Sequence, residues 1–121
     1  MYYQQFQSRK KYGNIPTTYE GIQYHSKRES TKAWELDQLV KTKEIRSWTR
    51  QGREALYGAN GDHICNYFVD FVIEHNDNTK ELLEIKSKIT ATEVWRLKWK
   101  MLEDKYKYEI TRGEIKLTVE Y

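Results

Sequence analysis

Three apolar segments joined by short turns constrain the fold of this chain more than any other sequence feature. Residues 64–74 are the clearest strand, being rich in aromatic and β-branched side chains. Residues 45–51 alternate as a half-buried strand does, and residues 81–86 follow after another turn. The two connections, Gly-Ala-Asn-Gly-Asp and Asn-Asp-Asn-Thr, are rich in turn-forming residues and too short for a crossover. The sequence therefore predicts an antiparallel meander of three strands.

A first helix is predicted before this meander, from Ser26 to about Lys41. Its apolar residues lie three and four positions apart and form one stripe: Ala33, Leu36 and Val40. Ser26 and Glu29 have the spacing of an N-terminal capping box. The stripe predicts that one face of this helix packs on the sheet.

A second helix is predicted over residues 92–106, and a last strand over residues 115–119 closes the chain. We expect the second helix to bury Val94, Leu97 and Met101 on one face, with Trp95 and Leu102 beside them. The predicted fold is mixed α/β (α+β), with an α-β-β-β-α-β core and a central mixed sheet flanked by helices.

Length and composition describe one small domain. The chain has 121 residues, and no run approaches the roughly 18 apolar residues of a membrane span. Its one cysteine excludes an internal disulfide and fits a reducing compartment. The N-terminus lacks the basic-then-apolar pattern of a secretory signal, so the expected location is the cytoplasm.

The excess of positive charge lies at the N-terminus. The chain carries 21 Lys and Arg against 18 Asp and Glu. Residues 1–19 contain Arg9, Lys10 and Lys11 and no acid, so the rest of the chain is balanced. We interpret residues 1–19 as an extended basic and aromatic arm, and residues 20–121 as a single domain.

Two of the predicted strands carry charged residues inside apolar runs. Asp70 interrupts residues 64–74, and Glu84 and Lys86 occupy one face of the next strand. An unpaired buried carboxylate costs several kcal/mol, so such acids need a cation or hydrogen bonds. If the turn pairs these strands, Asp70 and Glu84 lie close together and repel. A divalent metal relieves that repulsion, and oxygen ligands favour Mg²⁺ or Mn²⁺ over zinc.

Glu29 extends the same candidate site. It continues the apolar stripe of the first helix one turn towards the N-terminus, so it points towards whatever that helix packs on. Each acid also has a purely structural interpretation. Capping of its helix together with Ser26 could be the whole role of Glu29. Asp70 could be a buried carboxylate bonded to backbone amides. Glu84 and Lys86 could form the exposed face of an edge strand.

Together these residues resemble a known family. Asp70, followed on the next strand by Glu84-Ile85-Lys86 and preceded by a helix bearing Glu29, is similar to the motif of the PD-(D/E)XK nuclease superfamily. The resemblance extends from about Tyr19 to Val119. The acid and Glu-x-Lys alone are common by chance, and the strand–hairpin–strand context with the upstream glutamate makes the motif more specific.

Further segments resemble small phage-encoded members, which are endonuclease-like or Holliday-junction-resolvase-like. Their helix opens with Ser-Lys-x-Glu, here Ser26-Lys27-Arg28-Glu29. Their strand before the loop carries a glutamine, here Gln51, and their acid strand ends in Asp-Phe-Val, here Asp70-Phe71-Val72. Val69 stands where the superfamily's name has proline, a position that the superfamily keeps loosely.

The resemblance implies a restriction-endonuclease-like fold and a metal cofactor, Mg²⁺ or Mn²⁺. It implies that Asp70 and Glu84 hold the metal together with the backbone carbonyl of Ile85, and that Glu29 binds it directly or through water. Lys86 is expected to orient the attacking water or to neutralise the charge developing on the phosphate. Gln51 is expected to assist in placing the water.

The expected function is a Mg²⁺-dependent DNA endonuclease that acts on branched or recombining DNA, such as a Holliday junction. No helix-turn-helix pattern predicts reading of a defined sequence. The alternative is a non-catalytic DNA-binding or assembly factor that retains the nuclease fold. By analogy with the superfamily, symmetric cutting of two strands requires two sites and favours a homodimer.

Basic residues around the second helix are the expected DNA contacts. Arg96 and Lys100 lie four residues apart and share a helix face. The neighbouring acids Glu93, Glu103 and Asp104 leave an ordinary solvated face as the alternative. The complete expected set for phosphate binding is Arg9, Lys10, Lys11, Lys88, Arg96, Lys98 and Lys100.

Overall fold

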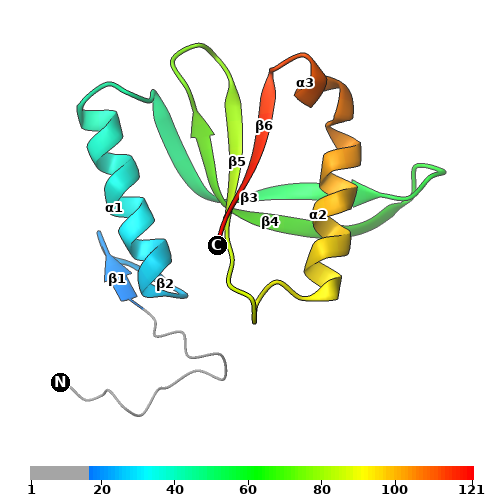
Figure 1. Ribbon diagram of the computed structural model, residues 1–121, viewed down its shortest axis with the longest axis horizontal. Helices are drawn as coiled ribbons and strands as arrows, with labels where there is room; N and C mark the ends of the chain where they lie inside the picture. The colour runs from blue at the N-terminus through cyan, green and yellow to red at the C-terminus, as the bar shows by residue number, and fades with distance from the viewer. Residues whose placement is uncertain (1–16) are drawn as a thin grey trace.

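A computed structural model describes residues 17–121 (Figure 1). Its elements follow in the order β1 (Thr17–Tyr19), β2 (Ile22–Tyr24), α1 (Lys27–Lys41), β3 (Ser47–Tyr57), β4 (His63–Glu74), β5 (Lys80–Ile85), α2 (Glu93–Lys105), α3 (Lys107–Thr111) and β6 (Ile115–Glu120). This order confirms the predicted α-β-β-β-α-β core. It adds the short helix α3, which the sequence pattern did not indicate.

The central sheet has four strands in the order β3-β4-β5-β6. β3, β4 and β5 pair antiparallel, as the short turns predicted. The chain returns through α2 and α3, and β6 then pairs parallel to β5, from Lys80↔Ile115 to Ile85↔Glu120. The sheet is therefore mixed, and β5 is an interior strand with neighbours on both sides.

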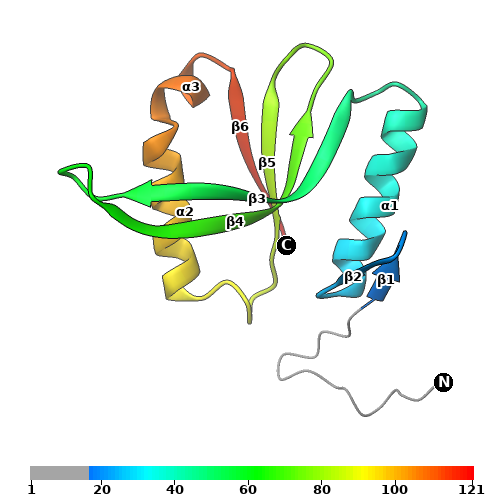
Figure 2. The same ribbon diagram turned by 180° about the vertical axis from the view of Figure 1, so that it is seen from behind.

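The two long helices cover opposite faces of β5. Leu83 belongs to the apolar cluster built around α1, whereas Leu82 belongs to the cluster built around α2. Figures 1 and 2 show α1 and α2 on either side of β5 and β6. Successive side chains of a strand point to opposite faces, so one strand contributes to both clusters.

α1 packs as its apolar stripe predicted. Ser26 caps the helix, its hydroxyl accepting a hydrogen bond from the Glu29 amide at 3.2 Å. Ala33 and Leu36 are buried against the sheet, and Val40 packs at the edge of the same cluster. The β1–β2 hairpin closes this cluster with the buried ring of Tyr24.

The predicted apolar face of α2 is wrong for Val94 and Leu97, whereas Trp95 and Leu102, expected beside them, are buried. Val94 and Leu97 are 62% and 61% exposed, and the buried residues of the helix are Trp95, Trp99 and Leu102. Only Met101 of the predicted stripe packs against the cluster. Two tryptophans bury far more apolar area than a valine and a leucine, and this burial sets the rotation of the helix.

β3 and β4 extend beyond the rest of the sheet as a two-stranded ribbon. β4 pairs with β5 only over residues 71–74, from Phe71↔Leu83 to Glu74↔Lys80. Its remaining residues pair with β3 alone, and the ribbon runs behind α2 in Figure 1. β4 therefore separates from β5 at Asp70.

β3 and β4 approach each other closely beside this branch point, at Gly52. Gln51 has φ of 53°, and Gly52 follows it in a continuous strand. A Cβ on Gly52 would overlap a methyl group of Val72 and touch Val69. Gly52 is thus required for the close approach of β3 to β4.

The described residues include the last residues of the predicted arm. Thr17–Tyr19 form β1, and the Tyr19 hydroxyl donates a hydrogen bond to Asp37 of α1 at 2.5 Å. Arg9, Lys10 and Lys11 lie outside the described residues. Within residues 17–121, no helix combines the length and apolar character that spanning a membrane requires.

Candidate metal centre

One cavity lies at the branch point between β4 and β5. Five of the residues predicted for the metal site line it. The cavity has a volume of about 220 Å³ and lies between the start of α1 and the end of β5. It is lined by Glu29, Asp70, Glu84, Ile85 and Lys86, together with His25, Ser26, Arg28, Ser87 and Thr90. The structure thus brings together residues from three separate elements.

Asp70 and Glu84 continue the β4–β5 register but bond through their side chains. The Asp70 amide donates to Glu84 Oε1 at 3.2 Å, and Asp70 Oδ2 accepts from the Ile85 amide at 2.8 Å. These bonds satisfy backbone donors at the point where the ladder between the two strands ends. The structural interpretation of Asp70 as an acceptor of backbone amides is therefore correct, and it does not remove Asp70 from the cavity.

Glu84 is almost fully buried, at 4% exposed. Its Oε2 lies 3.4 Å from Lys86 Nζ, which provides a counter-charge. It belongs to an interior strand, paired with Val119 of β6. The interpretation of Glu84 and Lys86 as the exposed face of an edge strand is therefore wrong.

Glu29 reaches the cavity from the first turn of α1. Its amide contributes to the helix cap, and its carboxyl group lines the cavity. Burial, together with the negative charges of Asp70 and Glu84, raises the pKa of Glu29 to about 7. Burial and the charge of Asp70 likewise raise the pKa of Glu84, and burial raises the pKa of Asp70. The three acids destabilise one another's charged forms.

This donor set fits a divalent cation. The cavity gathers three carboxylates and a backbone segment, and hard oxygen ligands suit Mg²⁺ or Mn²⁺. Within residues 17–121, no three His, Cys, Asp or Glu side chains already form a metal-binding group. Asp70 and Glu84 instead accept hydrogen bonds from each other's strands. Metal binding therefore has to draw the carboxylates together, which would also relieve their repulsion.

Sequence reasoning missed two residues behind Glu84. The Tyr67 hydroxyl accepts a hydrogen bond from Trp95 Nε1 at 2.8 Å and lies close enough to the Glu84 carboxylate to interact with it electrostatically. Trp95 also lies beneath Lys86, whose Nζ is 5.1 Å from the ring centroid. The register of β4 and the rotation of α2 bring them together, and neither can be read from spacing along the chain.

A half-buried cation, Arg50, was also missed. Its guanidinium lies 4.9 Å from the centroid of the Tyr24 ring, and its Nε has no hydrogen-bond partner among the described residues. Its charge lowers the pKa values of Glu29 and Asp70 and so partly offsets the effect of their burial. Alternation along residues 45–51, which places Arg50 on the same face as Trp48, was the available signal.

Gln51 is not among the residues that line the cavity. It is exposed on β3, between the pairs Arg50↔Phe71 and Gly52↔Val69. It therefore lies opposite Asp70 in the register of the β3–β4 ribbon. Its neighbour Arg50, and not Gln51, influences the acids of the cavity electrostatically.

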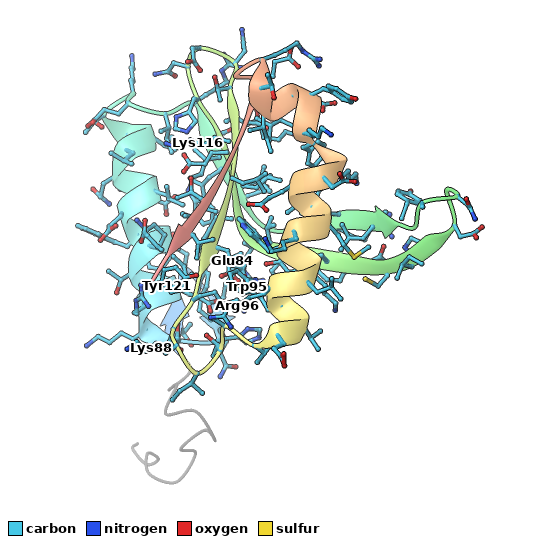
Figure 3. The ribbon with its side chains drawn as sticks, turned by 45° about the vertical axis from the view of Figure 1, so that its right-hand side comes forward. Glu84, Lys88, Trp95, Arg96, Lys116 and Tyr121 are labelled. Carbon is cyan, nitrogen blue, oxygen red and sulfur yellow. The ribbon has the colours of Figure 1, made fainter. Side chains whose placement is uncertain are left out.

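The predicted DNA contacts of the described chain occupy the loop before α2 and the helix itself. Lys88, Arg96 and Lys100 are exposed, and Lys98 is half-buried. Figure 3 shows Arg96 next to Trp95 on α2, with Lys88 in the loop below. The Arg96 guanidinium also donates to the Ala91 carbonyl at 2.5 Å. A further basic residue, Arg28, lines the cavity and was not predicted as a contact.

Comparison with known proteins shows one relationship. Neither the curated proteins nor the solved structures gave a match to this chain. Residues 2–118 match a protein family, and this match covers nearly the whole chain. The chain belongs to the family described as "Protein of unknown function (DUF1064)".

Proposed function

We propose that this protein is a Mg²⁺-dependent DNA endonuclease with a restriction-endonuclease-like fold. One observation carries the proposal: Glu29, Asp70, Glu84 and Lys86 line one cavity at the point where β4 leaves β5. The mixed sheet with helices on both faces is compatible with that fold. A cavity that gathers three acids and one lysine suits metal-assisted hydrolysis of a phosphodiester bond.

The roles of the residues follow from their positions. Asp70 and Glu84, with the Ile85 carbonyl, are the proposed ligands, and Glu29 completes the set directly or through a water molecule. Bound Mg²⁺ at such a site polarises the scissile phosphate and lowers the pKa of a water molecule. The carboxylates can bind a metal ion only in their ionised form. The positive charges of Lys86 and Arg50 favour that form.

Lys86 is proposed to act on the substrate side of the centre. Its ammonium group lies 3.4 Å from Glu84 Oε2 and stacks against Trp95, so its position is defined from two directions. From there it can donate a hydrogen bond to the attacking water or to a phosphate oxygen. Either contact stabilises the negative charge that develops in the transition state.

Asp70→Asn tests the proposal with little change in shape. We expect cleavage with Mg²⁺ to fall by at least a hundredfold, because a neutral amide is a poor ligand for the metal. DNA binding should persist. Asp62→Asn, in the exposed turn between β3 and β4, is the matched control and should cleave like the wild type. A four-way junction, a nicked duplex, single strands and a linear duplex serve as substrates, and full cleavage by Asp70→Asn would disprove the proposal.

One observation supports a second candidate, a non-catalytic DNA-binding or assembly factor. Asp70 and Glu84 already bond to backbone amides, and no three-residue metal group is preformed in the described part of the chain. Titration with Mn²⁺ separates the candidates. The nuclease binds Mn²⁺ at this cavity, whereas the assembly factor binds DNA without any metal requirement.

The proposed nuclease acts on branched DNA as a two-fold homodimer in the cytoplasm. Resolving a junction symmetrically requires two centres, which a closed dimer supplies. The arm with Arg9, Lys10 and Lys11, together with the exposed cations of α2, is proposed to hold the phosphate backbone.

A further inference from the structure

We propose that Tyr67 and Trp95 are positioning residues of the candidate metal centre. They are neighbours of Glu84 and Lys86 and do not line the cavity. Their proposed role is to fix the orientation of the Glu84 carboxylate and the position of Lys86. This inference rests on the proposed function, because it concerns how the metal ligands are held.

The hydrogen bonds between these residues have a fixed direction. An indole N–H can only donate, so the Tyr67 oxygen must be the acceptor of the 2.8 Å bond from Trp95 Nε1. The single hydroxyl proton of Tyr67 then remains available for the Glu84 carboxylate, with which Tyr67 interacts electrostatically. The proposed chain of donors runs from Trp95 through Tyr67 to the Glu84 carboxylate.

Burial makes this chain rigid. Glu84, Tyr67 and Trp95 are 4%, 7% and 7% exposed. Hydrogen bonds at such depth face little competition from water. The carboxylate accepts a hydrogen bond from the Asp70 amide at 3.2 Å and lies 3.4 Å from Lys86 Nζ, with Tyr67 as a further neighbour. Contacts from β4 and from the residue after β5 restrict its rotation and present it to the cavity.

Trp95 connects Glu84 with Lys86. Its N–H edge orients Tyr67, and its ring lies 5.1 Å from Lys86 Nζ as a cation–π contact. The ring is itself stacked on Trp99, with centroids 5.7 Å apart and planes 28° apart. Figure 3 shows Trp95 on α2 beside Glu84 on β5. One side chain of α2 thereby aligns both a proposed ligand and the proposed catalytic lysine.

Tyr67→Phe removes only the hydroxyl group and tests the proposal. Loss of a group that orients a metal ligand costs about 10- to 100-fold in metal affinity. We expect Mn²⁺ affinity, measured by electron paramagnetic resonance, to fall by about that factor. The KM for DNA should stay unchanged while kcat at limiting Mn²⁺ falls, because Tyr67 does not contact the substrate.

Tyr106→Phe is the matched control. Tyr106 packs against the same apolar cluster and donates its hydroxyl to a carboxylate, Glu54 Oε1, at 2.5 Å. It has no contact with the cavity. We expect Tyr106→Phe to bind Mn²⁺ like the wild type, although it too removes a hydroxyl. Equal Mn²⁺ affinity for Tyr67→Phe and the wild type would overturn the positioning role and leave the proposed function standing.

The wild-type protein supplies a second measurement that requires no variant. In a Mg²⁺ titration followed by NMR, the indole N–H signal of Trp95 should shift, because a cation bound to Glu84 changes the electrostatic environment of Tyr67, the acceptor of the Trp95 hydrogen bond. The indole N–H of Trp48, which donates to Asp37 Oδ1 at 2.8 Å, should stay in place. A stationary Trp95 signal at saturating Mg²⁺ would overturn the proposal. If the wild type binds neither Mg²⁺ nor Mn²⁺, the proposed function fails and this inference fails with it.

Discussion

Single residues decide the electrostatics of the cavity. Glu84 is nearly inaccessible to solvent, yet it lies beside Asp70 and forms an ion pair with Lys86. Burial of a carboxylate disfavours its charged form, and neighbouring acids add to that effect. Lys86 and Arg50 act in the opposite direction. Glu29 and Glu84, whose pKa values rise to about 7, are therefore only partly ionised near neutral pH.

These raised pKa values predict how stability depends on pH. The pKa of Glu29 rises from its usual 4.5 to about 7. Between those values the folded protein binds more protons than the unfolded chain, so stability falls as pH rises. The Tm, followed by circular dichroism without metal, should decrease from pH 5 to pH 8, and Mg²⁺ should restore part of it at pH 8. Glu29→Gln should flatten the decrease, and an unchanged slope would contradict this electrostatic explanation.

At the scale of elements, local patterns gave the helices and strands but not every buried face. The Ser26 cap and the stripe of α1 are both confirmed. The turns of Asn, Gly and Asp fixed the β3-β4-β5 meander, because such short loops allow only antiparallel pairing. In α2, apolar residues occur on more than one side, so periodicity alone could not choose among its faces. The two tryptophans decided the choice by packing on the β3–β4 ribbon.

A pair of substitutions in α2 measures this difference between faces. Trp99→Ala removes a ring that is 8% exposed and stacked on Trp95, and it should destabilise folding by about 3–5 kcal/mol. Leu97→Ala removes a side chain that is 61% exposed and should change stability by less than about 0.5 kcal/mol. Urea unfolding measures both values. A larger effect for Leu97→Ala would mean that this face is covered in solution.

At the scale of the whole molecule, charge is divided between the N-terminal segment and the domain. The three cations Arg9, Lys10 and Lys11 account for the entire net charge of +3. Within the domain the acids gather partly in the cavity, where a bound metal would neutralise them. The surface that we propose for DNA binding would then be more basic than the net charge alone indicates.

Replacing Arg9, Lys10 and Lys11 with glutamine tests the arm. Each phosphate neutralised by a protein cation adds about 0.9 to the slope of log affinity against log salt on duplex DNA. The variant should bind DNA more weakly and with a shallower slope, measured by fluorescence anisotropy. Lys41, Lys43 and Lys80, also replaced with glutamine, form a control of equal charge in exposed positions of the domain. An equal slope for wild type and arm variant would assign the arm to folding or dimerisation instead.

The sequence by itself determined the elements, their order and the acids that share a site. Periodicity, caps and turns are local properties, and the charged interruptions at Asp70 and Glu84 stood out against apolar neighbours. Tertiary structure alone decided the rotation of α2, the branch of β4 from β5 and the contacts of Tyr67, Trp95 and Arg50 with the site. These depend on register and on packing between residues distant along the chain. Such contacts form only when the whole sheet and both helices bury their apolar surfaces together.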